Sequence, residues 1–177
     1  MALADPYCAY VLQLDAGGSH QVEDAASLIE CAQTAKPTPD VVLGSRFCPG
    51  ANYLGTHGPW WRPWASRLMA FMCNTAHGDG HYTDWTSGYR LFSRSVIEYL
   101  LRREYHARMH GWQIEVLAYA SAHGFIIDEV PITYIAGRSS FNRAIGYETM
   151  RTLWRVWSAI GWRKSRIEED TYADPGT

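Results

Sequence analysis

The chain has 177 residues, of which 47% are hydrophobic and 14% aromatic. This composition predicts one globular domain with a sizeable core and excludes a disordered, collagen-like or coiled-coil protein. No run reaches the roughly 18 consecutive apolar residues that span a bilayer, and the first residues lack the basic end and apolar run of a signal peptide. We therefore expect a cytoplasmic protein.

The formal net charge of -2 conceals a difference between the two ends of the chain. Residues 1–45 carry six acidic side chains and one basic side chain, whereas residues 138–166 carry seven basic side chains and Glu148 as the single acid. We expect the basic end to face an anionic partner.

The first predicted unit is a strand, a helix and a second strand. Residues 8–14 form a nearly continuous apolar run that ends at Asp15, which is typical of a buried parallel strand. Ser19 is expected to cap a helix that ends before Lys36. Residues 40–44 then predict the second strand. This order indicates an α/β protein with a mostly parallel sheet flanked by helices.

The middle of the chain begins with a segment rich in Gly and Pro over residues 48–64, which favours a loop. A helix is expected from about 63 to 74. Further elements are expected as a strand over 86–92, helices over 94–103 and 113–122, and a strand over 125–135. Pro131 should place that last strand at a sheet edge or a bulge.

The end of the chain predicts a basic amphipathic helix over 141–166, followed by a frayed tail over 167–177. Arginine and tryptophan side chains alternate along this helix, a pattern typical of helices that lie on an anionic membrane surface. An ordinary helix whose tryptophans pack on the sheet accounts for the pattern equally well. No linker divides the chain, so residues 1–177 are expected to form a single domain, with peripheral membrane contact left open.

Two charged residues follow the first two predicted strands, Asp15 after 8–14 and Arg46 after 40–44. In open α/β sheets, ligands gather beyond the carboxyl ends of the strands. An acid beside glycines such as Gly17 suits a divalent ion that bridges to a diphosphate. The alternative is that Asp15 merely begins a turn.

Six segments occur in the order found in one known family. They are Leu14-Asp-Ala-Gly-Gly-Ser-His20, Gly44-Ser-Arg-Phe47, Arg62 with Ser66, Asp84-Trp-Thr-Ser-Gly-Tyr-Arg90, Gly111-Trp-Gln-Ile-Glu115 and Glu129-Val-Pro-Ile-Thr-Tyr134. The chain resembles glycosyltransferase family 2, and within it the dolichyl- or polyprenyl-phosphate mannosyltransferases. The resemblance implies a Rossmann-related GT-A fold, a nucleotide-sugar donor, and inverting transfer to an acceptor that is commonly a lipid phosphate.

The sequence departs from the family at the donor side. The strand and loop that begin the family's nucleotide-binding part have no counterpart before residue 8, so the resemblance covers an N-terminally truncated domain. The family's Asp-x-Asp reads Asp15-Ala-Gly17, which lacks one of two metal-binding carboxylates. Asp15, Gly17 and Ser19 are the expected donor-binding residues. Asp15 could still hold Mg²⁺ or Mn²⁺ with help from phosphates and Ser19 or His20, but we expect weak or absent metal binding.

The resemblance assigns Arg46, Arg62 and Ser66 to the phosphate of the acceptor. The chemistry agrees, because a guanidinium matches phosphate oxygens with two parallel hydrogen bonds and a hydroxyl adds a directional donor. Arg62 lies among tryptophans and could instead stack on an indole. Arg90 could also serve the phosphate, although a salt bridge is the commoner role for such an arginine.

Asp84 precedes the Thr86–Arg90 segment, where the resemblance places the reaction centre. A hydroxyl acceptor would need a general base there, and Asp84 is then the candidate catalytic residue beside Asp15. A phosphate acceptor is already ionised and needs only positioning. Alternatively, Asp84 only caps the turn that follows it.

Three functions therefore remain open. The first is a glycosyltransferase with a phosphate-bearing acceptor. The second keeps the fold but uses a hydroxyl acceptor on a saccharide or on a modified DNA base, and only here would nucleic acid be a partner. The third is a non-catalytic binding module or partial subunit that completes a partner chain, because the strand 8–14 would otherwise present an unpaired edge. A homo- or hetero-oligomer is compatible with each of them.

Overall fold

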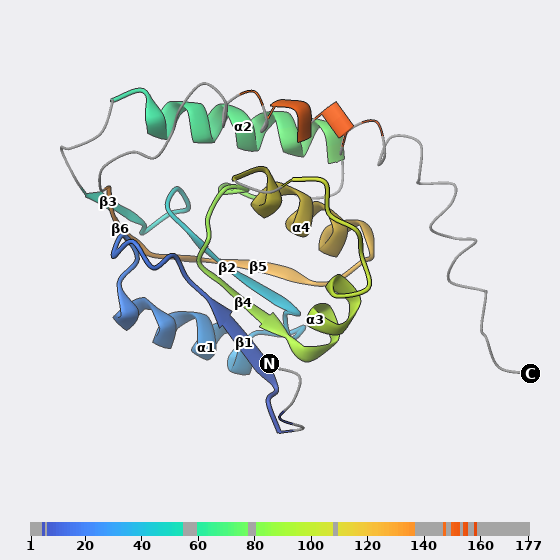
Figure 1. Cartoon of the computed structure of the whole chain (residues 1–177). Coiled ribbons are helices and arrows are strands. Elements are labelled where there is room, and N and C mark those ends of the chain that lie inside the picture. Colours follow the sequence, from blue (N-terminus) through green and yellow to red (C-terminus); the bar gives the residue numbers. More distant parts are fainter. Residues whose placement is uncertain are drawn as a thin grey trace, which may run out of the picture.

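A computed structural model of the chain describes residues 5, 7–54, 60–77, 81–107, 110–136, 147, 150–152, 154, 155 and 158 (Figure 1). The strands are β1 (Tyr10–Gln13), β2 (Val41–Ser45), β3 (Asn52–Leu54), β4 (Arg90–Ser93), β5 (Ile127–Pro131) and β6 (Thr133–Ile135). The helices are α1 (Ala25–Thr34), α2 (Arg62–His77), α3 (Arg94–Leu100) and α4 (His110–Ala122), and a short 3-10 helix, η2 (Val22–Asp24), precedes α1. The predicted α/β class is confirmed.

The main sheet has the strand order β1-β4-β2-β5. β4 lies antiparallel between β1 and β2, whereas β2 and β5 run parallel, so the sheet is mixed rather than mostly parallel. An apolar run predicts a strand but carries no information on its direction, which accounts for the difference. Since β1 and β2 are both antiparallel to β4, their carboxyl ends meet at the same edge of the sheet. Strands β3 and β6 form a second, parallel pair.

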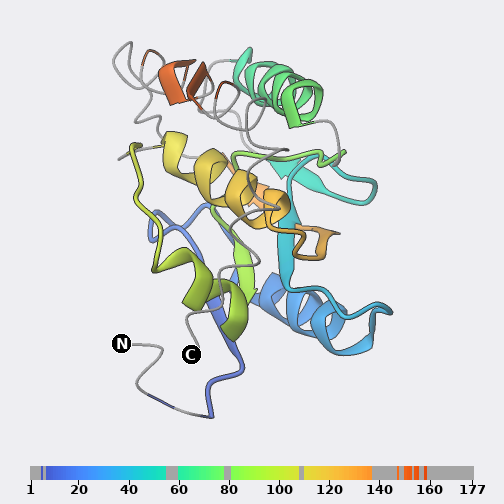
Figure 2. The same cartoon turned by 90° about the vertical axis from the view of Figure 1, so that its right-hand side faces the viewer.

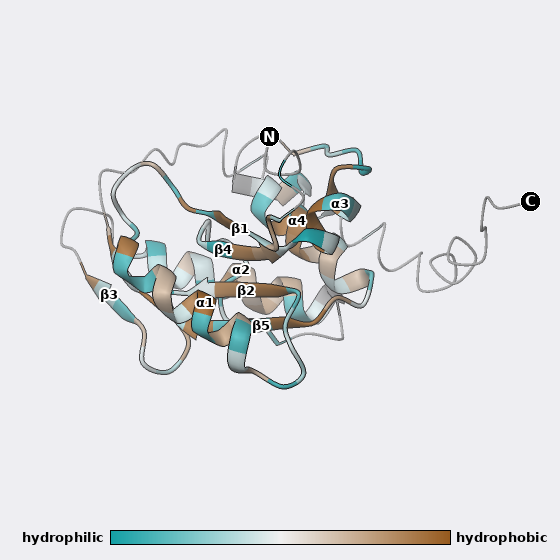
Figure 3. Cartoon of the chain, turned by 90° about the horizontal axis from the view of Figure 1, so that it is seen from below, coloured by the Kyte–Doolittle hydropathy of each residue, from teal (hydrophilic) through white to brown (hydrophobic). Residues whose placement is uncertain are grey.

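Helices cover both faces of the main sheet. β2 is buried on both sides, and its residues alternate between the two, as the pleat of a strand requires. Val42 packs with Leu28 of α1, whereas Leu43 packs with Ile114 of α4. β2 is accordingly brown in the hydropathy view (Figure 3). α2 lies outside α4 and contacts it through Ala70 and Cys73, so it forms an outer layer (Figure 2).

The first helix begins later than predicted. η2 and α1 start at Val22 and Ala25, and the side chain of Asp24 makes no capping hydrogen bond. Its carboxylate accepts instead from the backbone N–H of Thr133, 2.7 Å away. The prediction that Ser19 caps this helix is therefore wrong, because a contact with the distant β6 decides the local structure.

Two predicted strands are shorter in the structure. Of the expected strand 86–92, only residues 90–92 pair in the sheet, and the pairing continues to Ser93. The expected strand 125–135 divides at Ile132 into β5 and β6, which belong to different sheets. Pro131 is the last residue of β5, an edge strand, as predicted. β1 is the other edge strand, and its residues are half-buried rather than buried.

Most of the predicted terminal helix over 141–166, and all of the tail over 167–177, lies outside the described residues. The described residues from 147 to 158 are helical. Among them, Thr152 is buried and packs against Gly111 at the start of α4. No helix in the described ranges is long and apolar enough to cross a bilayer.

Candidate functional site

A buried ion pair between Arg46 and Asp84 forms the centre of the candidate site. Arg46 follows β2 directly, and Asp84 lies in the irregular segment before β4. The Nε and Nη2 atoms of Arg46 each donate to a different carboxylate oxygen of Asp84 at 2.6 Å, and the backbone N–H of Arg46 also donates to that carboxylate. Nη2 additionally donates to the hydroxyl of Thr86 at 2.6 Å. The side chain of Asp84 has no exposed surface, so this pairing is shielded from water.

This ion pair makes Asp84 a poor general base. Burial by itself would raise the pKa of Asp84, but the charge and hydrogen bonds of Arg46 outweigh burial and hold the pKa below its usual range. The Arg46 pKa is raised in turn, because Asp84 outweighs the effect of burial. Asp84 also accepts from the backbone N–H and the hydroxyl of Thr86. The alternative prediction, that Asp84 caps the turn, is thus confirmed, and the structure does not support a role as catalytic base.

A second carboxylate, Glu129 on β5, holds the segment that carries Asp84. It accepts from the backbone N–H groups of Thr83 at 2.9 Å and of Asp84 at 3.2 Å. The hydroxyl of Thr83 lies 2.6 Å from that of Ser45, at the end of β2. Burial raises the pKa of Glu129. The Arg46–Asp84 pair is therefore fixed from both β2 and β5.

Asp15 lies beyond the end of β1, as predicted, and its side chain is about half exposed. Its carboxylate rests against Gly88, where an added Cβ would lie 2.5 Å from Oδ1. The backbone N–H of Asp15 donates to Nδ1 of His20 at 3.3 Å. A side chain at position 88 would displace this carboxylate, so Gly88 helps to set the position of Asp15.

His20 is a buried histidine that links Asp15 to Arg46. Burial lowers its pKa, Asp15 opposes this, and Arg46 reinforces it. Nδ1 accepts a hydrogen bond, so the neutral ring carries its proton on Nε2. The ring packs against Tyr89 and Tyr134, with centroid distances of 5.0 and 5.4 Å. Asp15 and Arg46 follow β1 and β2, whose carboxyl ends meet at one edge of the sheet, so the two residues lie on the same side of it.

Aromatic rings surround the guanidinium of Arg46. Its Cζ lies 5.1 Å from the ring centres of both Phe47 and Tyr134. Tyr53 of β3 stacks beside Phe47 and contacts Tyr134. Burial raises the pKa of Tyr53, and Arg46 and Arg62 both oppose that rise. Arg62, at the start of α2, thus acts electrostatically on Tyr53, and its role toward an acceptor phosphate stays a prediction.

Arg90 is a buried structural residue and does not line the candidate site. Its side chain is fully buried, and its guanidinium donates to the backbone carbonyls of Ser87, Gln113 and Trp85 at 2.7 to 3.0 Å. Burial lowers its pKa to about 10, so it remains charged at neutral pH. The prediction that Arg90 contacts an acceptor phosphate is not supported, because its donors are taken up inside the protein.

The remaining predicted residues lie on the surface near these groups. Gly17 is exposed, and an added Cβ there would meet no atom within 4 Å. Ser19 and Ser66 are half-buried. Their roles toward a donor and an acceptor stay predictions.

The residues that could hold a divalent ion are few. Within the described ranges, no three side chains of His, Cys, Asp or Glu come together as a ligand set. Asp15 offers an accessible carboxylate, but Nδ1 of His20 is already taken by the Asp15 backbone. The described residues alone do not fit a protein-only metal site. Binding of Mg²⁺ or Mn²⁺ at Asp15 therefore stays a proposal.

Sequence reasoning gave no role to several residues that build the site. They are Phe47, Thr83, Glu129 and Tyr134. Glu129 carried one signal, because a charged residue inside an apolar strand usually has a specific partner. The other three needed the tertiary structure, since their contacts join segments that are distant in the chain.

Comparisons with known proteins show what this chain is similar to. No protein-family model matches the chain. It is 28% identical over 157 residues to the polyprenol monophosphomannose synthase of Mycolicibacterium smegmatis, a match that covers 85% of this chain. It is also 28% identical over 162 residues to the undecaprenyl-phosphate mannosyltransferase of Micrococcus luteus, over 88% of this chain. The chain is therefore similar in sequence to polyprenyl-phosphate mannosyltransferases.

The similarity to polyprenyl-phosphate mannosyltransferases agrees with the resemblance read from the six sequence segments. The matched part spans 56% of the first relative and 63% of the second. The chain therefore spans less than two thirds of the length of either relative. The α/β architecture with helices on both faces of the sheet fits the GT-A-like fold that the resemblance implied.

Proposed function

We propose that this chain is a glycosyltransferase that transfers a sugar from a nucleotide-sugar to a polyprenyl-phosphate-like acceptor. The observation that carries the proposal is the placement of Asp15 and Arg46 beyond the carboxyl ends of β1 and β2, which meet at one edge of the sheet. The names of the two relatives support a lipid-phosphate acceptor. Mannose is the sugar that those names suggest.

The reaction needs little proton chemistry at the acceptor. An oxygen of the acceptor phosphate attacks the anomeric carbon of the sugar, and the bond from that carbon to the nucleoside diphosphate breaks with inversion. The attacking oxygen is already ionised, so no general base is required. This supports a phosphate over a hydroxyl acceptor, because Asp84, the candidate base, is held as a buried anion by Arg46.

Asp15 belongs to the leaving-group side of this reaction. If Mg²⁺ or Mn²⁺ binds there, the ion would be held by Asp15 together with the diphosphate and would neutralise charge on the leaving group. The protein itself contributes a carboxylate whose position is set by Gly88 and by the backbone hydrogen bond to His20.

Transfer measured with a panel of nucleotide-sugars and farnesyl phosphate tests the proposal. We expect turnover with at least one donor and a loss of about a hundredfold in Asp15→Ala, because the leaving diphosphate loses its partner. Glu30→Ala, an exposed acid on α1, is the charge-matched control and should keep full activity. The absence of both turnover and nucleotide binding in the unchanged protein would contradict the proposal and favour the non-catalytic module.

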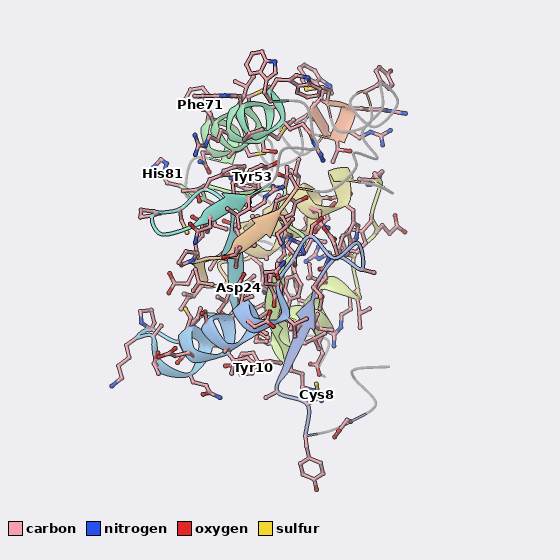
Figure 4. All side chains as sticks on the ribbon, turned by 90° about the vertical axis from the view of Figure 1, so that its left-hand side faces the viewer. Cys8, Tyr10, Asp24, Tyr53, Phe71 and His81 are labelled. Atoms are coloured by element: carbon pink, nitrogen blue, oxygen red, sulfur yellow. The ribbon has the colours of Figure 1, made fainter. Side chains whose placement is uncertain are left out.

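We further propose that α2 contacts the membrane that holds the acceptor. Its outward face carries large apolar side chains, and Leu68 and Phe71 are 60% and 67% exposed. Phe71 points away from the rest of the molecule (Figure 4). Residues 62–77 contain two arginines and no acid. An exposed apolar helix face with basic residues suits the interface of an anionic bilayer.

Flotation with vesicles rich in phosphatidylglycerol measures this contact. Replacing Leu68 and Phe71 by serine should lower the vesicle-bound fraction about tenfold or more, because two apolar side chains no longer enter the bilayer. Leu101→Ser is the matched control, since Leu101 is equally exposed at the end of α3. Equal flotation of the α2 variant and the unchanged protein would exclude α2 as the membrane contact.

A further inference from the structure

The guanidinium of Arg46 has little capacity left for a ligand. Its Nε and both hydrogens of Nη2 are used by Asp84 and Thr86, which leaves Nη1 as the nitrogen without such a bond in the described structure. Its positive charge is also balanced by the buried carboxylate of Asp84. A phosphate with two negative charges therefore needs another cation nearby.

Arg67 has the properties that Arg46 lacks. It lies one residue after Ser66 in α2 and is exposed. Its Cζ is 5.1 Å from the ring centre of Phe47 and 5.7 Å from that of Trp64. No acidic side chain within the described ranges forms an ion pair with Arg67. Its charge is thus uncompensated, while its position is set by two aromatic faces.

Phe47 brings the two guanidiniums together. Arg46 and Arg67 each lie 5.1 Å from the centre of its ring, so they are separated by no more than twice that distance. Tyr53, which is within electrostatic range of Arg62, stacks on the same ring. Arg46 and Arg67 therefore flank one aromatic ring, and Arg67 belongs to the exposed side of α2.

We propose that Arg67 is a further phosphate-binding residue of the acceptor site and that Phe47 is the residue that positions it. This inference rests on the proposed function, because the ligand is the phosphate monoester of the polyprenyl acceptor. Arg67 supplies the net positive charge, and a planar guanidinium can donate two parallel hydrogen bonds to phosphate oxygens. The aromatic faces reduce the freedom that such a long side chain would lose on binding.

Binding of farnesyl phosphate, measured by calorimetric titration of the full chain, tests the role of Arg67. Arg67→Gln should weaken binding about tenfold or more, as expected for a lost charge-assisted hydrogen bond. Arg67→Lys should recover only part of the affinity, because the ammonium keeps the charge but cannot donate the two parallel hydrogen bonds of a guanidinium. Arg103→Gln is the matched control, since Arg103 also lies over an aromatic ring, 4.4 Å from Tyr99, and its loss should leave binding unchanged.

Two further measurements show which group Arg67 binds. The candidates are the acceptor phosphate, the prenyl chain and phospholipid headgroups. Farnesol, which lacks the phosphate, should bind Arg67→Gln and the unchanged protein equally. Arg67 could instead bind phospholipid headgroups, and in that case Arg67→Gln would reduce binding to phosphatidylglycerol vesicles while farnesyl phosphate binds as before. That result would overturn the inference.

Phe47 is tested by a double-mutant cycle. Phe47→Leu should weaken farnesyl phosphate binding. The variant that carries both Phe47→Leu and Arg67→Gln should lose much less binding free energy than the sum of the losses in the two single variants. Phe47→Tyr keeps the ring and should restore binding, which a general defect in packing would not allow. Additive losses would overturn the positioning role. Unchanged binding in Arg67→Gln would overturn the inference but leave the proposed function standing, whereas an unchanged protein that binds no farnesyl phosphate would overturn both.

Discussion

Replacing Asp84 by alanine should lower the free energy of unfolding by about 3–5 kcal/mol, the range expected when one partner of a buried ion pair is removed. The change leaves the Arg46 guanidinium in a site built for a carboxylate. It also removes the acceptor of the hydrogen bond from the backbone N–H of Thr86. Equilibrium urea unfolding of the two proteins measures the difference. A loss below about 1 kcal/mol would show that water or another group replaces the carboxylate.

The same pair predicts a pH dependence. The pKa of Asp84 is lower in the folded protein than in the unfolded chain, so the unfolded chain binds a proton more readily. The contribution of Asp84 to stability is therefore complete above about pH 4 and is lost as the pH falls toward the lower folded value. Asp84→Ala should lack this part of the acid dependence. Replacing Arg46 and Asp84 together by apolar residues should cost less stability than Asp84→Ala alone.

Gly88→Ala should reduce sugar transfer about a hundredfold while the thermal stability changes little. The added methyl group would lie 2.5 Å from Oδ1 of Asp15, so one of the two must move. The carboxylate is the end of a half-exposed side chain and can rotate at little cost. A displacement of this size in a reacting group is sufficient for a hundredfold loss.

A displaced Asp15 carboxylate is distinguished from a folding defect by measuring steady-state transfer and thermal melts. The proteins to compare are Gly88→Ala, Asp15→Asn and the double variant. If Gly88 acts only through Asp15, the double variant should be no slower than Asp15→Asn. A melting temperature that falls by more than a few degrees in Gly88→Ala would assign the loss to the fold instead.

Local pattern was enough to predict the parts of the site that depend on single strands. The apolar runs before Asp15 and after Asp40 predicted β1 and β2, and parallel strand ends placed Asp15 and Arg46 at one edge. The prediction held although β4 lies between the two strands, because β4 is antiparallel to both. A pattern with a period of two residues indicates a strand and its faces but not its neighbours.

Roles that depend on distant partners could not be predicted in this way. Arg90 has the charge and the sequence position of a phosphate ligand, yet its guanidinium donates to three backbone carbonyls from two segments. Asp84 has the position of a base, and its partner Arg46 lies 38 residues earlier in the chain. For such residues the sequence supplies the chemistry, whereas the fold decides which groups they meet.

The buried Arg90 has a consequence for how this region can change. The carbonyls of Trp85 and Ser87 belong to the irregular segment before β4, and the guanidinium donates to both from within the core. The turn that carries Thr86 and Gly88 is thus held in part by an internal cation. Substitutions on the surface that leave Arg90 in place should therefore leave this part of the turn unchanged.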